Sequence, residues 1–458
     1  MLPVGGDAVT DGSAGATGHG AVEVLRAGWV LTVDASDTVW SDGAVALGGG
    51  RILDLGPAAD VVARHPTAPV RHLPGHVLVP GFVNAHTHLG MVVLRGLADD
   101  RDLADFLAAV VPVESRILSA DLVRTATRAA AVESLSAGVT TALDMYYFAP
   151  DGRAGADEAG MRVLGGAVLF EGGPGIDSWD ELLAWADVVM ASTPAGPGRR
   201  AVLCPHSTYT VEPPQLAEVA ALARDHDAVV HVHAAETASE NADVLARHGH
   251  RPVGVLDAAG LLRPGTVLAH AVHLDDDELA LVAGSGAAVA HCPASNLKLA
   301  SGVARVPELL AAGAVVGLGT DGAASSNDLD LLGAARLAAL LHKGVGPGGG
   351  PGDATRLPAA QVVRMATMGG ARALGLDRDL GSIEVGKLAD LVAVDLDRPH
   401  VQPVHDPVSA LLYAAGRGDV TDVWVEGRHV VASGRTSLVE PERASADLRR
   451  LADRTGIG

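Results

Sequence analysis

Two histidines, His86 and His88, follow an apolar run in the segment VPGFVNAHTHLG at residues 79–90. Alternate side chains of a β-strand point to the same face, so both imidazoles are expected on one side. Two imidazoles in this arrangement make half of a zinc-type metal site. The alternative is a pair of hydrogen-bonded structural histidines at a strand end, and the rest of the chain has to decide between them.

Further histidines and acidic residues stand at the ends of later apolar runs. In chain order they are His206, His233, Glu236, His270 and Asp321. If the runs are neighbouring parallel strands, their carboxyl ends meet at one face and these side chains converge. Neutral imidazoles with one carboxylate suit a divalent cation that keeps a position open for water, and the other groups could move protons. The joint placement favours a metal site over structural histidines.

The elements that carry these residues alternate regularly between residues 77 and 376. Short runs rich in Val, Ala and Leu are each followed by a helical segment, and continuous apolar runs are typical of parallel strands covered on both faces. Eight such units predict an α/β protein with a (β/α)8 barrel, and an open doubly wound sheet is the alternative. The runs lie at residues 76–86, 138–145, 161–170, 200–207, 228–236, 266–273, 287–293 and 314–321.

The two ends of the chain have a different pattern. Residues 21–76 and 377–440 contain short strand patterns with turn signals, which predicts a small β-sandwich built from both termini beside a metal-dependent barrel at 77–376. Residues 1–20 are rich in Gly, Ala, Ser and Asp and are expected to be a disordered lead. Residues 441–458 are expected to form a C-terminal helix or tail.

Composition narrows the function classes. The formal charge is −21, with 34 Lys and Arg against 55 Asp and Glu, which argues against nucleic acid or an anionic membrane as a partner. Cys204 and Cys292 are the only cysteines, so no disulfide framework is expected. The first residues form no signal peptide, and no apolar run reaches the ~20 residues of a membrane span. A cytoplasmic protein is therefore expected.

Three more histidines lie near strand ends. His231 points the same way as His233, one step earlier on the run, and is expected to be a buried interior residue, with metal ligation as the lesser alternative. His273 and His291 could support the ligands through hydrogen bonds.

Several segments resemble the amidohydrolase superfamily: PGFVNAHTHLG, HVHAAET, VLAHAVHL, HCPASNLKLASG and LGTDGAASSNDLDLL. They are most similar to its branch of methylthioadenosine/S-adenosylhomocysteine deaminases, guanine deaminases and triazine hydrolases, and the similarity extends from about residue 22 to 435. The resemblance implies a hydrolase that acts on C–N bonds of cyclic amidines. Members with two metals bridged by a carboxylated lysine are a poor match, because the run at 200–207 contains no lysine.

The resemblance also implies roles for individual residues. Glu236 matches the acid that protonates a ring nitrogen, and His270 matches the residue that positions the attacking water. Asp321 matches the group that accepts the water proton and passes it to the leaving amine. The ligands of one divalent metal ion, with Zn²⁺ first and Fe²⁺ as the alternative, match His86, His88, His233 and Asp321.

Two further positions bear on the substrate. Glu114 resembles the residue that holds ribose hydroxyls in adenosine-type members, with an ordinary helix-start carboxylate as the alternative. His206 resembles the residue that contacts the purine. Members that take S-adenosylhomocysteine carry arginines after the third strand, whereas this chain has none there before Arg199 and has Glu171 and Asp177 instead. This difference favours a substrate without a free carboxylate.

The predicted function is hydrolytic deamination of an adenine nucleoside, such as 5′-methylthioadenosine, 5′-deoxyadenosine or adenosine, with release of ammonia. The alternatives are a deaminase of a free purine or pterin ring, a triazine amino- or chlorohydrolase, and a non-catalytic barrel protein. The expected partner is a small-molecule substrate, without nucleic acid or membrane, and a homo-oligomer stays open.

Overall fold

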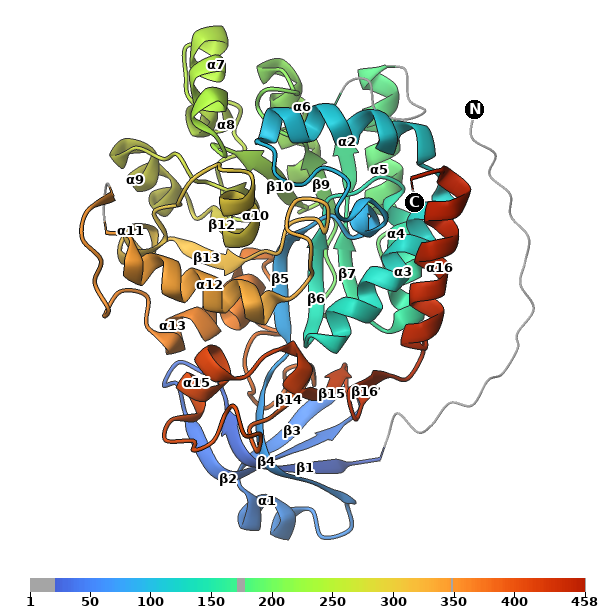
Figure 1. The fold of residues 1–458 in the computed structure, drawn as a ribbon, viewed down its shortest axis with the longest axis vertical. Helices are drawn as coiled ribbons and strands as arrows, with labels where there is room; N and C mark the ends of the chain where they lie inside the picture. Colours follow the sequence, from blue (N-terminus) through green and yellow to red (C-terminus); the bar gives the residue numbers. More distant parts are fainter. Residues whose placement is uncertain (1–20, 171–177, 347–348, 458) are drawn as a thin grey trace.

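The structure is a computed structural model that describes residues 21–170, 178–346 and 349–457. The expected disordered lead, and with it Glu171 and Asp177, lie outside the described residues. Figure 1 shows short central strands surrounded by helices and, at the lower end of the view, a separate small sheet made from both ends of the chain. None of the helices in the described ranges is long and apolar enough to cross a membrane.

Every apolar run predicted as a barrel strand forms a strand. Their side chains are buried almost throughout, because helices cover the strands from outside and other strands face them within. The third run is divided at Gly166 into two strands. In chain order the strands are β5 (Phe82–Thr87), β6 (Val139–Asp144), β7 (Arg162–Gly165), β8 (Ala167–Leu169), β9 (Val202–Pro205), β10 (Val229–Ala234), β11 (Thr266–His270), β12 (Ala288–His291) and β13 (Val315–Leu318).

Helices connect these strands. Some begin at side chains that accept free backbone N–H groups: Ser119 accepts from Leu122, and Thr237 from Glu240. The longer helices are α2 (Leu103–Ile117), α3 (Ala120–Ser136), α4 (Ala149–Ala159), α5 (Trp179–Ala191), α6 (Pro213–Asp225), α7 (Ala238–His248), α9 (Asp276–Ser285) and α12 (Leu331–Gly344). The shorter ones are η1 (Leu89–Leu94), α8 (Pro252–Ala258), α10 (Pro293–Lys298), α11 (Val306–Ala311), α13 (Ala359–Arg364), η3 (Met365–Gly369) and α14 (Gly370–Ala373).

The central strands pair in two parallel sheets. One contains β5, β6 and β7, and the other contains β8 to β13 in chain order. The sheets separate at Gly166, where a Cβ atom would lie 2.4 Å from the carbonyl oxygen of Val202. On the other side they meet, because the backbone N–H of Asp321, just after β13, donates to the carbonyl of His86 on β5 over 3.0 Å. Both sheets therefore bring the carboxyl ends of their strands to one face.

The terminal segments form one eight-stranded mixed sheet, where a sandwich of two sheets was predicted. The sheet curls until Ile52 donates its N–H to the carbonyl of Lys387 over 2.9 Å, and Ala389 to that of Gly50 over 2.9 Å. A strongly twisted sheet can thus enclose its own apolar core around the fully buried Trp424. Its strands are β1 (Glu23–Leu31), β2 (Val39–Gly48), β3 (Arg51–Pro57), β4 (Val70–Pro80), β14 (Leu391–Asp395), β15 (Val420–Val425), β16 (Arg428–Ala432) and β17 (Arg435–Thr436).

The boundary between the two parts lies later than the predicted residue 76. Strand β4 continues to Pro80 and pairs with β1 and β14, so residues 77–80 belong to the small sheet. The chain crosses at Gly81, where a Cβ atom would lie 2.2 Å from Oγ1 of Thr140, so glycine is needed for this close approach. The remaining helices are α1 (Ala58–Arg64), α15 (Pro407–Ser409), η4 (Ala410–Ala414), η5 (Arg417–Asp419) and the C-terminal α16 (Pro441–Thr455).

Candidate metal centre and active site

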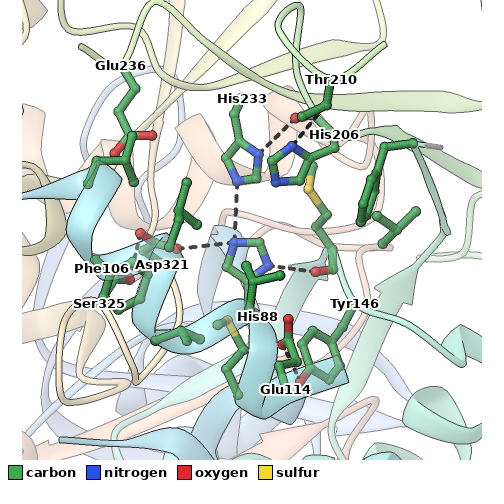
Figure 2. Close-up of a pocket in the computed structure, with 18 of the residues that line it drawn as sticks. His88, Phe106, Glu114, Tyr146, His206, Thr210, His233, Glu236, Asp321 and Ser325 are labelled. Carbon is green, nitrogen blue, oxygen red and sulfur yellow. Dashed lines mark hydrogen bonds and ion pairs between the residues drawn. The ribbon is translucent and has the colours of Figure 1, made fainter. Parts of the chain in front are cut away.

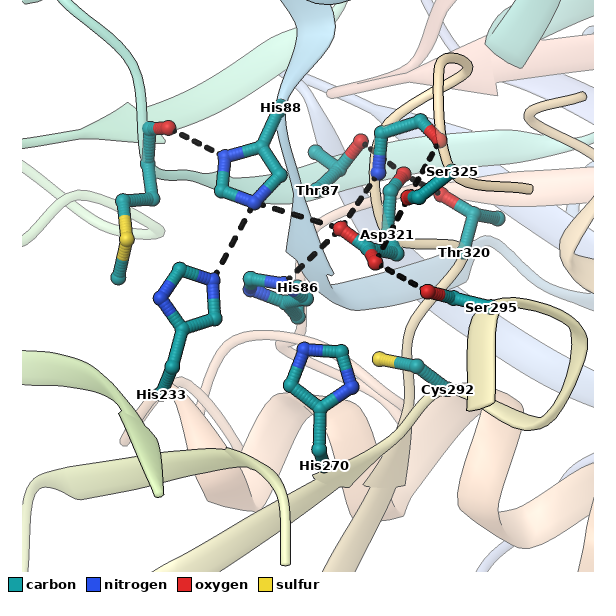
Figure 3. A network of polar contacts seen from close by, with 12 residues as sticks. His86, Thr87, His88, His233, His270, Cys292, Ser295, Thr320, Asp321 and Ser325 are labelled. Atoms are coloured by element: carbon teal, nitrogen blue, oxygen red, sulfur yellow. Dashed lines mark hydrogen bonds and ion pairs between the residues drawn. The ribbon is translucent and has the colours of Figure 1, made fainter. Parts of the chain in front are cut away.

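The predicted metal ligands converge at the carboxyl ends of the central strands. His86 lies on β5 and His88 directly after it, His233 lies on β10, and Asp321 follows β13. Oδ1 of Asp321 lies 3.3 Å from Nε2 of His86 and 3.3 Å from Nε2 of His88. Nε2 of His233 lies 3.3 Å from Nε2 of His88. Figure 3 shows the imidazoles and the carboxylate turned toward one another.

Hydrogen bonds behind two of the imidazoles determine which nitrogen faces this cluster. Nδ1 of His88 donates to the carbonyl of Met145 over 2.6 Å, and Nδ1 of His233 donates to the carbonyl of His206 over 2.8 Å. In the neutral rings Nε2 therefore carries a lone pair. With both rings neutral, two lone pairs would face each other across 3.3 Å beside a carboxylate. This donor set fits a divalent cation, because coordination would replace the repulsion between them.

His86 is the third imidazole of this cluster. Its ring is fully buried, and within the described chain its Nε2 makes no hydrogen bond, although it faces the cluster. Burial lowers the pKa of His86 to about 3, so the ring is neutral, as a metal ligand must be. Nδ1 of His86 lies 2.8 Å from Nε2 of His231, which is itself fully buried. His231 is thus the buried interior residue that the sequence predicts, and it holds a predicted ligand in place.

Asp321 is held as a carboxylate. Burial by itself raises the pKa of Asp321, but the adjacent imidazoles of His86 and His88 hold it well below its usual range. The Oδ2 atom accepts hydrogen bonds from the hydroxyls of Ser295, over 2.5 Å, and Ser325, over 2.8 Å. These contacts leave Oδ1 directed at the imidazoles.

Glu236 and His270 lie beside the cluster. Nε2 of His270, the last residue of β11, is 3.8 Å from Oε2 of Glu236, which follows β10. Nδ1 of His270 lies 2.8 Å from Oδ1 of Asn296, so the opposite nitrogen is directed at the cluster. Burial raises the pKa of Glu236. Burial lowers the pKa of His270, but the carboxylates of Glu236 and Asp321 outweigh it and raise this pKa. A carboxyl group with a raised pKa, Glu236, and one with a lowered pKa, Asp321, thus lie around one centre.

The second oxygen of Glu236 has its own support. Oε1 accepts a hydrogen bond from the hydroxyl of Ser301 over 3.2 Å, and Nε2 of His273 donates to the Ser301 carbonyl over 2.6 Å. His273 therefore supports the site indirectly. His291 lies instead against His342, with their Nε2 atoms 3.4 Å apart, and among the described residues it makes no hydrogen bond to a predicted ligand.

The backbone at these positions is strained. Ala235, His270 and Asp321 have φ angles of 52°, 71° and 60°, in the left-handed region that side chains other than glycine rarely adopt. Such strain persists only where the surrounding structure enforces it, and it is concentrated at functional sites. Here it lies at His270, the last residue of β11, and just after the ends of β10 and β13, next to the predicted site residues.

A cavity of about 300 Å³ opens onto the cluster. Figure 2 shows side chains from α2 on one side and from the strand ends on the other. Among the described residues that line it, none is Lys or Arg. Most of its walls are apolar, including Leu103, Phe106, Leu107, Val110, Phe170 and Leu299.

Glu114 is the acidic residue that α2 contributes to the cavity wall. It lies in the last turn of this helix, which begins at the N-cap Asp102, so the alternative of a helix-start carboxylate is wrong. Glu114 is 7% exposed, and its Oε1 accepts a hydrogen bond from the hydroxyl of Tyr146 over 2.7 Å. Burial raises the pKa of Glu114.

His206 lines the cavity just after β9, as the strand-end pattern predicts. Its Nδ1 lies 3.1 Å from Oγ1 of Thr210, and its ring centroid lies 5.5 Å from that of Phe170. Burial lowers the pKa of His206 to about 4, so the ring is neutral and Nε2 can hydrogen-bond an uncharged ligand.

Some residues of the site were not identified from sequence. Tyr146 directly follows the second strand run, so its position as a polar residue at a strand end could have identified it. Ser295, Asn296 and Ser301 lie within the segment HCPASNLKLASG, but nothing in their spacing indicates that they contact Asp321, His270 and Glu236.

Known proteins similar to this chain include enzymes of the kind that the site suggests. The model of the amidohydrolase family matches residues 77–430. The chain is 39% identical to a 5-methylthioadenosine/S-adenosylhomocysteine deaminase from Pelotomaculum thermopropionicum, over 94% of this chain and 98% of that protein.

Solved structures agree. The crystal structure of an adenosine deaminase from Xanthomonas campestris with bound zinc has a TM-score of 0.91 and 39% identity, and the match covers 96% of this chain and 99% of that one. An atrazine chlorohydrolase from Arthrobacter aurescens complexed with zinc has a TM-score of 0.87 and 27% identity, over 93% of this chain and 99% of that one. The chain described here belongs to the amidohydrolase family.

Proposed function

We propose that this protein is a metal-dependent hydrolase that deaminates an adenine nucleoside with an uncharged 5′ substituent. Substrates of this class are 5′-methylthioadenosine, 5′-deoxyadenosine and adenosine. The observation that carries the proposal is the pairing of Glu236, whose pKa is raised, with Asp321, whose pKa is lowered, at the floor of one cavity. The curated deaminase relative and the adenosine deaminase structure support the same reaction.

The cluster would hold one divalent cation through His86, His88, His233 and Asp321. Zinc is the first choice, because the similar adenosine deaminase structure contains it, and Fe²⁺ is the alternative. When bound there, the cation would lower the pKa of a coordinated water toward neutrality and make hydroxide available as the nucleophile.

The remaining chemistry belongs to the side chains. Asp321 is ionised and accepts the proton released when water attacks C6 of the adenine ring. Glu236, whose pKa is raised by burial, is the acid that donates a proton to the adjacent ring nitrogen, N1. His270, held through Asn296, orients the attacking water. Asp321 then passes its proton to the amino group, which leaves as ammonia when the C6–N bond breaks. The proton that remains on the new C6 hydroxyl returns to Glu236 as the C6 carbonyl forms.

The cavity wall favours a nucleoside over a free ring and an uncharged 5′ substituent over an amino acid. Glu114 offers a buried carboxylate that can accept hydrogen bonds from sugar hydroxyls, and His206 offers a neutral imidazole for the purine. A free carboxylate would find no cation among the described residues of the wall. Residues 171–177, which follow Phe170 in the sequence, contain Glu171 and Asp177 but no Lys or Arg. S-Adenosylhomocysteine is therefore expected to be a poorer substrate than 5′-methylthioadenosine.

The test is ammonia release by protein of measured metal content. The panel holds 5′-methylthioadenosine, 5′-deoxyadenosine, adenosine, S-adenosylhomocysteine, guanine and melamine, with His233→Ala as the control. Ammonia from the uncharged nucleosides, lost in the variant, supports the proposal. A strong preference for S-adenosylhomocysteine would contradict the argument from the missing cation, and silence on every nucleoside would overturn the proposed function.

A second candidate is hydrolysis that displaces another leaving group. The atrazine chlorohydrolase is similar along nearly the whole chain, and apolar walls also suit a triazine with alkyl substituents. Release of chloride from atrazine, without ammonia from nucleosides, would favour this candidate.

We also infer that the two parallel sheets close into one (β/α)8 barrel. The Asp321–His86 backbone hydrogen bond supports this closure, as does the tight packing of Gly317, where a Cβ atom would lie 3.0 Å from that of Ala85. The barrel would run from residue 81 to 376, with the small sheet formed by residues 21–80 and 377–440.

A further inference from the structure

A buried hydrogen bond joins two walls of the cavity. Tyr146 follows β6 and is 4% exposed, and its hydroxyl donates to Oε1 of Glu114 on α2 over 2.7 Å. Both residues line the cavity, and Figure 2 shows them side by side below His88. Within the described part of the chain, Oε2 of Glu114 accepts no hydrogen bond. One oxygen is therefore occupied by the protein, and the other remains available to a ligand.

The Tyr146 ring is held by close packing. A Cβ atom on Gly90 would lie 2.1 Å from Cε1 of Tyr146 and 2.3 Å from its Cδ1. Gly90 is not among the residues with a positive φ angle, so the backbone there does not require glycine. Glycine is needed there because the tyrosine ring occupies the space that a side chain would take. Tyr146 therefore has little freedom to turn its hydroxyl elsewhere.

The residue before Tyr146 also supports the candidate metal centre. The carbonyl of Met145 accepts the Nδ1 hydrogen of His88, and the next residue, Tyr146, donates to Glu114. Two consecutive residues thus hold a predicted metal ligand and a carboxylate of the substrate wall at a defined separation.

We propose that Tyr146 is a positioning residue that orients the Glu114 carboxylate toward the vicinal hydroxyls of a sugar and so determines specificity for ribosides. This inference rests on the proposed function. With Oε1 occupied by Tyr146, the carboxylate presents Oε2 to the cavity, where its lone pairs can accept from a 2′,3′-diol. Without the tyrosine hydroxyl the carboxylate can rotate, and the orienting constraint is lost.

The experiment compares Tyr146→Phe with the wild-type protein on adenosine and 2′,3′-dideoxyadenosine. We expect kcat/KM for adenosine to fall about tenfold, mainly through KM, because a hydrogen bond to a charged group is lost. The value for the dideoxy nucleoside, which lacks the hydroxyls, should change less than about twofold. Bound metal is measured in each protein, and Tyr413→Phe, on η4 away from the cavity, is the matched control.

Equal falls for both nucleosides would overturn the positioning role, because a merely structural effect does not distinguish the sugars. An unchanged adenosine value would overturn it as well. Gly90→Ala gives a second measurement. If the ring position matters, this change should reproduce the adenosine-specific loss. Tyr146→Leu introduced beside it should relieve the steric clash without restoring the preference for adenosine, because leucine has no hydroxyl.

Binding of inosine and 2′,3′-dideoxyinosine by calorimetry separates this proposal from the proposed function. Wild-type protein that releases no ammonia, but whose preference for inosine is lost in Tyr146→Phe, would overturn the deaminase assignment and support the positioning role. Wild-type protein that releases ammonia but shows no inosine preference would support the deaminase assignment and overturn the positioning role. Failure of both measurements would overturn both.

Discussion

Nδ1 of His86 and Nε2 of His231 lie 2.8 Å apart in the fully buried interior beneath the metal centre. The two rings meet edge to face, with centroids 4.8 Å apart and planes at 82°. A hydrogen bond behind a ligand sets its tautomer and the direction of its other nitrogen. In the described part of the chain His231 contacts the predicted ligands through His86, so we expect it to affect metal binding through that ring.

Replacing His231 should weaken metal binding without removing a ligand. His231→Phe keeps a ring of similar size but cannot hydrogen-bond His86, so we expect the Kd for zinc to rise about 10- to 100-fold. Competition with a chromophoric chelator measures this Kd, and kcat per bound metal should stay within a few-fold of wild type. His291→Phe is the control, because His291 is equally buried on β12 but contacts His342. Equal losses in both variants would contradict the role of His231.

Glu236 should be required for turnover but not for metal binding. Glu236→Gln keeps the shape and the Ser301 contact but removes the transferable proton, so kcat should fall roughly 10²- to 10⁴-fold while bound metal stays at the wild-type level. Because burial raises the pKa of Glu236, the wild-type rate should decline as the pH rises through that pKa. A variant that keeps more than a tenth of the wild-type kcat would rule out this acid role.

A buried histidine should make stability depend on pH. Burial lowers the pKa of His342 to about 4, against an ordinary value of 6.5. Between these two values the unfolded chain binds a proton that the folded chain does not, so stability falls as the pH falls through this window. The loss attributable to His342 should approach about 2 to 3 kcal/mol near pH 4.

Thermal unfolding of wild type and His342→Gln at pH 7 and pH 4.5 measures the effect. The variant should lose less stability than wild type on acidification. His250→Gln, at an exposed position, should behave as wild type does. If His342→Gln and wild type show the same change in Tm between the two pH values, the linkage to His342 is wrong.

Arg162 should stabilise the junction between the central strands and the small sheet. This fully buried guanidinium donates to Asp390, to Glu426 over 2.6 Å, and to Oγ1 of Thr141 over 2.9 Å. Arg162→Met leaves Asp390 buried and unpaired, and we expect a loss of about 3 to 5 kcal/mol.

The exposed pair Arg26–Asp42 is the comparison, because solvent screens it and Arg26→Met should cost much less stability than Arg162→Met. Chemical denaturation measures both variants. Adding Asp390→Leu to Arg162→Met should recover part of the loss, since the stranded charge is removed. A loss below 1 kcal/mol for Arg162→Met would show that the buried pair contributes little.

Much of the fold could be predicted from local patterns. The apolar runs predicted every central strand, because a strand covered on both faces must be apolar along its whole length. The third run was not expected to divide, since its break depends on the approach of Gly166 to Val202 on another strand. The curled single sheet was also missed. Whether two sets of short strands form two sheets or one depends on hydrogen bonds between the segments at residues 50–52 and 387–389, which lie far apart in sequence.

The amino-acid sequence alone was enough to identify the available chemistry: imidazoles and carboxylates at strand ends, and no cation after the third strand. Residue type and strand periodicity are local properties, so one chain suffices to identify them. How these groups are arranged and used depends on the folded structure. The Tyr146–Glu114 hydrogen bond, the His231 support of His86 and the pKa values of Glu236 and Asp321 arise from contacts between different strands and helices, and from burial. Distance and desolvation between such elements exist only once the chain has folded.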